Sequence, residues 1–312
     1  MLIIHDLDSF RPDWSHANIT LGVFDGIHIG HQELLKRIQR KRDSYKRILV
    51  TYHPHPDIVL GKRREKYGME LFTYEEKVSL LQKYDIDVVV VLPFTQELAN
   101  TTAEIFLEKI LVEKLKAKYI VIGYDQCFGK GREGNFEFLK KREEKYGYHV
   151  EQLSPVKIDD KIVSSSRIRE LLKAGEIRQA NLLLGKNFFI TGTVVKGFQR
   201  GKLIGFPTAN LDVPLTKVIP KIGVYIGYCE LGGVLYKAMI NIGFNPTFNN
   251  QLLSIEAHIL NFDKLIYGEI VKFHFVDRIR DEMKFSSVDE LRNQLQKDRE
   301  MADKLPECEK CF

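Results

Sequence analysis

A glycine-rich stretch near the N-terminus carries two histidines whose spacing suits phosphate chemistry. Glycines occupy positions 22, 26 and 30, and His28 and His31 lie three residues apart in the same run. Glycine lets a backbone bend sharply and lets a phosphate approach it closely. Histidines at this spacing lie on one side of a helical turn, where both rings can donate hydrogen bonds to phosphate oxygens. The pattern predicts a site that anchors and polarises a nucleotide; the alternative is an ordinary strand-to-helix turn with surface histidines.

The residues on either side of this stretch predict the elements that would position it. Residues 18–24 form a short apolar, β-branched run that is typical of a strand. Residues 32–42 place Leu34, Leu35 and Ile38 on one helical face. The strand would therefore end at the glycine turn. The N-terminus of the following helix, with its partial positive charge, would face a bound phosphate.

The first half of the chain alternates predicted strands and helices. This βαβα order is typical of a doubly wound parallel sheet, in which ligands bind beyond the carboxyl ends of the strands. Continuous apolar runs such as residues 88–92 are typical of strands that are buried on both faces. The other predicted strands are 47–53, 119–122 and 149–153, and the helices are 73–83, 102–115, 135–146 and one that ends at 173.

Three further loops at predicted strand ends have the composition of ligand-binding loops. Residues 53–56 read His-Pro-His-Pro and would hold two histidines in a stiff loop. Residues 123–134 are rich in glycine and basic side chains, and residues 163–169 place serines and arginines at the start of a helix. The last arrangement is a typical anion site. Each loop alone could be structural, but together they would meet at one edge of the sheet.

The second half of the chain predicts a different fold. Predicted strands separated by turn residues replace the helices after about residue 185, and Gly232 and Gly233 fit a two-residue hairpin turn. We therefore expect an α/β domain over residues 1–184. Residues 185–312 would form a mainly antiparallel β-barrel with a terminal helix packed on it. The predicted strands are 188–196, 224–231, 235–242, 252–260 and 266–276, and the helix is 287–299.

A second glycine-rich loop lies inside the β half. Gly197, Gly201 and Gly205 recur every four residues among basic side chains that include Lys202. Such a loop can surround a polyphosphate with backbone donors while the cations neutralise it. It is not a Walker loop, because no Gly-Lys-Ser/Thr follows it. A flexible barrel loop is the alternative interpretation.

Polar residues near this loop could complete a phosphoryl-transfer site. Thr208 and Asn210 carry oxygen ligands suited to a hard cation such as Mg²⁺. Glu256 is an acidic residue within an otherwise apolar predicted strand. Its carboxylate would meet a cation, accept a proton or simply face solvent. Asn241 begins a turn-rich strand end that could line the same cavity.

The composition limits the class of protein. With 312 residues, 44% apolar and 29% charged, the chain suits a soluble globular protein of two domains. A net charge of +5 favours anionic substrates but is far from the basic stripe of a nucleic-acid binder. No apolar run approaches the roughly 20 residues that span a membrane. Four scattered cysteines, including a lone Cys308/Cys311 pair, and the absence of a signal-peptide pattern in residues 1–10 indicate a cytoplasmic protein.

Taken together, these segments resemble the bacterial bifunctional riboflavin kinase/FMN adenylyltransferase family. The resemblance covers nearly the whole chain in the family's order. The Gly-x-His-x-Gly-His element is shared by many nucleotidyltransferases, whereas Gly-Phe-Pro-Thr-Ala-Asn at 205–210 is highly specific. Residues 22–31, 54–56, 123–134 and 164–169 resemble the adenylyltransferase half, and 192–210, 241–248, 256–268 and 280–285 resemble the kinase half.

The resemblance implies a kinase in the C-terminal half. ATP would phosphorylate the ribityl 5′-hydroxyl of riboflavin to give FMN. Glu256 would accept the hydroxyl proton, while Thr208 and Asn210 would hold Mg²⁺ and the phosphates. Catalysis of this kind depends mostly on positioning and charge neutralisation.

The resemblance implies an adenylyltransferase in the N-terminal half. The FMN phosphate would attack the α-phosphate of a second ATP, giving FAD and pyrophosphate. Because that phosphate is already a nucleophile, no protein base is required. His28 and His31, with Ser164 and Arg167 from the loop opposite, would stabilise the charge that grows on the ATP phosphates.

The resemblance also implies binding residues. Gln126 stands where family members often carry an aromatic residue, and Tyr124 or Phe128 could replace it in flavin stacking. The implied flavin-binding residues are His55, Asp125, Phe128 and Asn241. The implied nucleotide-binding residues are Gly22, Phe24, Asp25, Gly30, Gly123, Ser164, Ser165, Gly197, Gly201, Lys202, Gly205, Pro207, Thr208 and Asn210.

Two other functions are alternatives. Gln126 is the one sequence feature that favours a kinase-only enzyme with a degraded N-terminal half. A flavin-binding regulatory protein that has lost its activity would have the same fold. In each case we expect riboflavin, FMN and ATP as partners rather than nucleic acid or membrane. The sequence indicates no oligomeric state.

Overall fold

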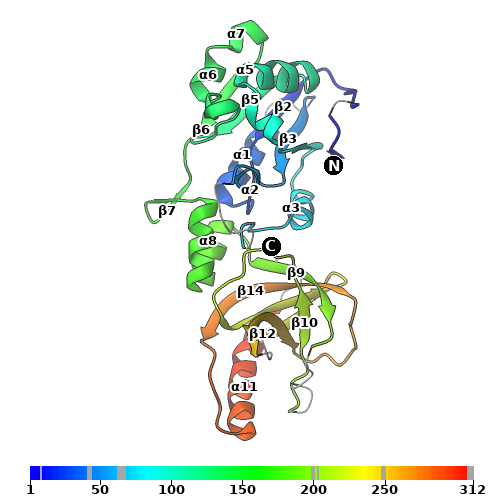
Figure 1. Cartoon of the computed structure of the whole chain (residues 1–312), viewed down its shortest axis with the longest axis vertical. Coiled ribbons are helices and arrows are strands. Elements are labelled where there is room, and N and C mark those ends of the chain that lie inside the picture. The colour runs from blue at the N-terminus through cyan, green and yellow to red at the C-terminus, as the bar shows by residue number, and fades with distance from the viewer. Residues whose placement is uncertain are drawn as a thin grey trace. The chain divides into compact units, whose positions relative to one another are not determined.

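The chain folds into two compact units, which are described separately below (Figure 1). The N-terminal unit comprises Met1–Lys66 and Phe72–Ser164, and the C-terminal unit comprises Tyr67–Leu71 and Ser165–Phe312. None of the described helices is long and apolar enough to cross a membrane. The computed structural model describes residues 1–7, 9–40, 44–61, 68–197, 201, 204–246 and 251–307.

The N-terminal unit is built on a six-stranded parallel sheet with the strand order β1-β4-β3-β2-β5-β6. The central strands are buried along their length because helices cover both faces of such a sheet. The doubly wound parallel sheet is therefore confirmed. Its strands are β1 (Leu2–Ile4), β2 (Ala17–Leu21), β3 (Lys46–His53), β4 (Val88–Pro93), β5 (Ala117–Gly123) and β6 (His149–Leu153).

The four helices predicted for this unit are present, two of them broken, and the short helices α2, α4 and η2 were not predicted. Thr73 caps the helix at 74–81, in a reciprocal capping box with Glu76. The predicted helix 102–115 changes hydrogen-bond register at Phe106, and the predicted helix 135–146 is interrupted at Arg142. The helices are α1 (Ile29–Gln39), α2 (Pro56–Val59), α3 (Tyr74–Leu81), α4 (Gln96–Asn100), α5 (Ala103–Ile105), η1 (Phe106–Lys114), η2 (Lys130–Arg132), α6 (Phe136–Lys140) and α7 (Glu143–Tyr146).

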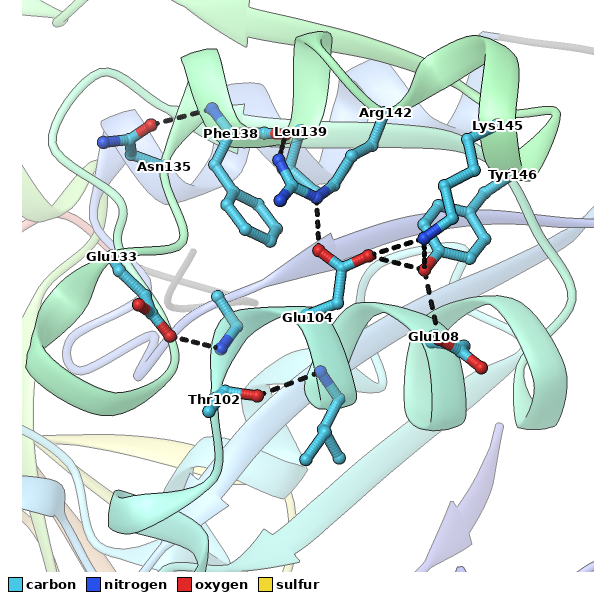
Figure 2. Close-up of polar contacts among 12 residues, drawn as sticks. Thr102, Glu104, Glu108, Glu133, Asn135, Phe138, Leu139, Arg142, Lys145 and Tyr146 are labelled. Atoms are coloured by element: carbon cyan, nitrogen blue, oxygen red, sulfur yellow. Dashed lines mark hydrogen bonds and ion pairs between the residues drawn. The ribbon is translucent and has the colours of Figure 1, made fainter.

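Polar contacts tie the α5–η1 helix to α6 and α7 (Figure 2). Glu104 accepts hydrogen bonds from Tyr146, Lys145 and Arg142, which lower the pKa of its carboxyl to about 2. The Arg142 guanidinium also lies 3.6 Å from the ring centroid of Phe138. The non-helical backbone of Arg142 thus lets one side chain reach both a carboxylate and a ring. These contacts explain why the predicted single helix is interrupted.

The C-terminal unit is a closed six-stranded antiparallel barrel with the order β10-β13-β12-β11-β14-β9. Helix α11 packs on it, and Ala302 and Leu305 join a small apolar core with Ile226 and Met239. The predicted barrel and terminal helix are confirmed. The elements are α8 (Ser165–Ala174), α9 (Ile177–Leu184), β9 (Phe188–Val195), β10 (Ala209–Asp212), β11 (Gly223–Leu231), β12 (Val234–Pro246), β13 (Gln251–Ile259), β14 (Ile270–Arg280) and α11 (Val288–Asp303).

A short segment from the N-terminal half of the sequence is part of the C-terminal unit. Residues 68–70 form backbone hydrogen bonds with residues 215–218. The buried Lys217 ammonium donates a hydrogen bond of 2.7 Å to the carbonyl of Leu71, and the Arg169 side chain donates one to Met69. We call residues 68–71 the strap.

The loop at 129–134 is ordered by contacts that a side chain would disturb. Both glycines have a positive φ, 73° at Gly129 and 63° at Gly131, but Gly131 is left-handed helical with a ψ of 11° whereas Gly129 has a ψ of 171°, a region essentially restricted to glycine. A Cβ at Gly129 would lie 2.6 Å from the backbone nitrogen of Ala103, whereas a Cβ at Gly131 would meet nothing within 4 Å. The carboxylate of Glu133 also accepts a hydrogen bond from that Ala103 nitrogen (Figure 2). Gly129 is therefore needed for both conformation and space.

The two glycines predict a matched pair of stability effects. Gly131→Ala should cost about 1–2 kcal/mol of unfolding free energy, because alanine disfavours the left-handed region. Gly129→Ala should cost a further 1–3 kcal/mol or so, through overpacking against Ala103 and through a backbone region that is essentially restricted to glycine. Urea unfolding of the two variants measures the difference. Equal destabilisation would show that the contact with Ala103 is not restrictive.

Candidate functional site

The predicted glycine turn joins β2 to α1. Phe24 and Ile27 adopt left-handed backbone angles, with φ of 53° and 41°, and Gly26 has a φ of 88°. The side chains of Phe24 and Ile27 are almost completely buried, so they anchor the turn in the core. A strained conformation of this kind persists only when the surrounding structure determines it, and such strain is typical of functional sites.

The two histidines lie together at the start of α1. Nδ1 of His28 accepts a hydrogen bond of 3.3 Å from the backbone nitrogen of His31, so His28 is the N-cap of the helix. The two rings are stacked, with centroids 3.7 Å apart. Because Nδ1 is an acceptor here, a neutral His28 carries its proton on Nε2. A Cβ at Gly30 would lie only 3.2 Å from Nδ1, so glycine at this position leaves room for the ring.

The loop after β5 lies beside this turn. A Cβ at Gly22 would lie 3.2 Å from Oε1 of Gln126, so the Gln126 side chain covers the start of the turn. Asp125 lies within the same loop. A Cβ at Gly123 would lie 3.7 Å from Oδ1 of Asp125. Burial, with a smaller effect of the Asp125 charge, raises the pKa of Tyr124. The structure thus brings the β5 loop to the glycine turn, as the sequence predicted.

Other residues predicted for this site have more varied positions. Asp25 is buried within the turn. His55 is the N-cap of α2, where Nδ1 accepts a hydrogen bond of 3.1 Å from the Asp57 nitrogen. Ser164 ends the N-terminal unit, whereas Ser165 and Arg167 belong to α8 of the C-terminal unit. Their approach to the histidines stays a prediction.

Phe128 lies in the hydrophobic core rather than beside a ligand site. Its side chain is 5% exposed and packs against the rings of Phe106 and Phe138. Its backbone pairs with Gly134, so the second half of the predicted ligand loop is used to build the fold. This position corrects the idea that Phe128 stacks on a flavin. Tyr124, which is 40% exposed, is the aromatic residue of this loop that remains accessible.

The predicted kinase residues meet on three neighbouring strands of the barrel. Glu256 on β13 pairs in register with Asn210 on β10 and with Asn241 on β12. Side chains of directly paired residues lie roughly 5 Å apart on the same face. Thr208 Oγ1 donates a hydrogen bond of 2.9 Å to Oε2 of Glu256. The structure therefore gathers these four predicted residues into one polar cluster, which we call the barrel site.

Glu282 is an acidic residue of the barrel site that the sequence analysis did not single out. Burial raises the pKa of its carboxyl, Asn241 donates a hydrogen bond to it, and the charge of Glu256 raises that pKa further. A Cβ at Gly243 would lie 1.9 Å from Oε1 of Glu282, so this carboxylate lies directly over the glycine. Its position in the Arg-Asp-Glu run at 280–282 was the sequence signal available.

Two of the described glycines in the second loop fit closely against neighbouring atoms, Gly197 against a side chain and Gly201 against the backbone. A Cβ at Gly197 would lie 2.4 Å from Nδ2 of Asn210, and one at Gly201 would lie 2.2 Å from the carbonyl oxygen of Phe206. Gly205 has a φ of 87°. Nδ1 of His258 lies 2.9 Å from the carbonyl oxygen of Pro207. The predicted residue Lys202 and the Cys308/Cys311 tail lie outside the described residues.

The donor set of the barrel site suits a hard cation. Thr208, Asn210 and Glu256 offer a hydroxyl, an amide and a carboxylate oxygen within one cluster. The described part of the chain contains no group of three or more His, Cys, Asp or Glu side chains that could hold a metal. Mg²⁺ commonly binds through one or two protein oxygens while substrate phosphates and water complete its shell. The residues present fit such a cation.

Comparison with known proteins assigns a family to each part of the chain. Residues 10–167 match the FAD synthetase family, and residues 184–305 match the riboflavin kinase family. A structure of a Streptococcus pneumoniae chain named a macrolide-efflux protein has a TM-score of 0.88 at 33% identity, over 98% of this chain and 99% of that one. The name of that protein refers to a different activity, so we take from it the shared fold alone.

Curated relatives match both parts together. A bifunctional riboflavin kinase/FMN adenylyltransferase of Haemophilus influenzae is 36% identical over 97% of this chain and 98% of its own length. The proteins of the same name from Bacillus subtilis and Escherichia coli are each 34% identical, over 96% and 90% of this chain and 96% and 90% of their own lengths. With both histidines and the barrel site in the expected order, the chain belongs to the bifunctional riboflavin kinase/FMN adenylyltransferase family.

Proposed function

We propose that this chain phosphorylates riboflavin with ATP to give FMN and then adenylylates FMN with a second ATP, releasing pyrophosphate and forming FAD. The observation that carries the proposal is that one chain holds two separate phosphate-type sites. The stacked pair His28/His31 lies in the segment that matches FAD synthetase, and the Thr208–Glu256 hydrogen bond lies in the segment that matches riboflavin kinase.

In the kinase reaction, the ribityl 5′-hydroxyl oxygen of riboflavin attacks the γ-phosphorus of ATP and ADP leaves. Glu256 accepts the hydroxyl proton, and its hydrogen bond from Thr208 fixes the carboxylate that receives it. Asn210 and Asn241, paired across the strands with Glu256, orient the ATP phosphates and the ribityl chain. We place Glu282 beside them as a second carboxylate, which restricts the position of the ribityl chain of riboflavin.

Thr208 and Asn210 are the residues that would hold Mg²⁺. A bound Mg²⁺ neutralises the charge of the β- and γ-phosphates of ATP. The glycines of the preceding loop would supply backbone donors to the phosphates. Side chains at Gly197 and Gly201 would collide with Asn210 and Phe206, which favours glycine at both positions.

In the adenylyl transfer, an oxygen of the FMN phosphate attacks the α-phosphorus of ATP and the bond to the bridging oxygen of pyrophosphate breaks. The Nε2 proton of His28 and the amino end of α1 stabilise the charge on the phosphates. His31 packs on His28 and contributes a second donor. Ser164, Ser165 and Arg167 would bind the same phosphates, and Asp125 and His55 would contact the flavin.

Each half of the chain is assigned one of the two reactions. We assign adenylyl transfer to residues 1–184 and phosphoryl transfer to residues 185–312, which is supported by family matches at 10–167 and 184–305.

We also place the protein in the cytoplasm. Cys127 and Cys229 are free thiols, and burial raises the pKa of Cys229 to about 12, which keeps that thiol protonated.

The overall proposal is tested by incubating the purified chain with riboflavin, ATP and MgCl₂ and separating the flavins by chromatography. We expect FMN first and FAD afterwards. FMN without FAD would support the kinase-only alternative. Unchanged riboflavin with retained flavin binding would support the regulatory alternative and contradict the proposal.

Replacing Glu256 by glutamine should impair the kinase alone. The amide keeps the shape of the side chain but accepts no proton, so we expect FMN formation to fall about 10²-fold or more. FAD formation from supplied FMN should stay at the wild-type rate. The matched control is Glu300→Gln, which neutralises an exposed carboxylate of α11. Loss of both activities in Glu256→Gln would contradict the assignment of sites.

Replacing His28 by asparagine should impair the adenylyl transfer alone. Asparagine is a good N-cap, so α1 keeps its first turn while the ring donor is lost. We expect FAD formation to fall about 10²–10³-fold, the usual effect of removing one donor from a developing charge. FMN formation is the internal reference in the same molecule. His149→Asn, at an exposed residue of β6, is the control, and equal rates in the two variants would exclude this role for His28.

A further inference from the structure

Helix α3 directs a lysine into the interior of the N-terminal unit. Lys77 lies in the middle of this helix and is only 8% exposed, whereas lysine is almost never fully buried unless its charge is satisfied. The capping box of Thr73 and Glu76 fixes the first turn of α3 and so the direction of the next side chain. The ammonium of Lys77 must therefore have acceptors inside the unit.

The acceptors lie at the carboxyl ends of β2 and β3. The Nζ of Lys77 donates to the carbonyl oxygen of Val23 at 3.2 Å and lies 3.4 Å from Oγ1 of Thr51. The buried Thr51 hydroxyl donates to the same carbonyl at 3.0 Å. The Val23 carbonyl thus accepts two hydrogen bonds, one of them from a charged donor. Two donors therefore fix the direction of this carbonyl: the Thr51 hydroxyl at 3.0 Å and the charged Lys77 ammonium at 3.2 Å.

Val23 follows Gly22 at the start of the turn that leads to the histidines. The next residue, Phe24, has a left-handed backbone, and the turn continues through Gly26 and Ile27 to the N-cap His28. A peptide plane fixed at Val23 sets the direction in which this strained turn starts. Removing one of its donors would let the turn relax, and His28 would move with it.

The charge of Lys77 also reaches the neighbouring strand end. Burial, followed by the positive charge of Lys77, lowers the pKa of His53, the last residue of β3. The ammonium therefore lies at the same sheet edge as the glycine turn. A positive charge at this edge attracts a triphosphate.

We propose that Lys77 is a positioning residue for the adenylyl transfer: together with the Thr51 hydroxyl, it holds the Val23 carbonyl and so places the turn that presents His28 to the ATP phosphates. This inference rests on the proposed function of the N-terminal unit. Lys77 acts through the turn and touches no reacting atom.

The test compares Lys77→Met with Lys83→Met in the full-length enzyme. Both changes remove one lysine charge, but Lys83 is exposed just beyond the end of α3. In Lys77→Met we expect the KM for ATP in FAD formation to rise about tenfold and kcat to fall, since a bond from a charged donor is lost. FMN formation should keep its wild-type rate, and Lys83→Met should match wild type in both reactions.

The KM for ATP separates positioning from a general loss of structure. A misfolded fraction lowers the apparent kcat but leaves the KM of the remaining molecules unchanged. A lower kcat with an unchanged KM, or a Lys77→Met variant that equals Lys83→Met, would overturn the proposal. If wild type itself forms no FAD from FMN, the proposed function fails before any variant is compared.

Thr51 provides a second pair of variants that keeps the lysine. Thr51→Val removes the hydroxyl without changing the shape of the side chain, and Thr51→Ser keeps the hydroxyl. We expect Thr51→Val to raise the KM for ATP several-fold and Thr51→Ser to restore it toward the wild-type value. If Lys77→Met does not fold, this pair decides the question. Equal KM values in the two Thr51 variants would overturn the proposal.

Discussion

Parallel pairing of β2 with β3 and β5 is the constraint on which the N-terminal unit depends. Because the three strands run in the same direction, their carboxyl ends lie at one edge of the sheet. The glycine turn, the segment from Thr51 to His53 and the Gln126 loop follow those ends and are therefore neighbours. The buried Lys77 lies beneath the same edge. Sheet direction, rather than any one contact, brings these segments together.

The barrel solves a similar chemical problem by a different route. In the N-terminal unit, His28 and His31 come from a single short segment of the chain. In the barrel, Glu256 meets Asn210 and Asn241 because antiparallel register places them opposite one another, although they are far apart in the sequence. A slip of one residue along β13 would turn Glu256 to the other face, where Ile255 and Ala257 are buried. Closure of the sheet leaves little freedom for such a slip.

These two routes explain how much the sequence could predict. The strand–turn–helix around His28 is local, so spacing and glycine content predicted it. The fold class of each unit also followed from the patterns, whereas the order of strands in the sheet and in the barrel was not predicted. Strand β10 (Ala209–Asp212) escaped notice because four residues between a glycine loop and a proline carry little periodicity. The positions of Phe128 and Lys77 could not be predicted, since a loop phenylalanine and a helical lysine are usually interpreted as accessible. Their burial depends on tertiary packing.

The strap affects how the C-terminal unit can fold during synthesis and whether the two units can be encoded separately. Residues 68–71 leave the ribosome long before residues 215–218, with which residues 68–70 form backbone hydrogen bonds, so the C-terminal unit completes itself around a piece of chain that was made much earlier. Dividing the gene between the two activities would take the Leu71 carbonyl away from the buried ammonium of Lys217. A C-terminal unit made as an independent protein would therefore lack the strap and the hydrogen bond that Lys217 donates to it.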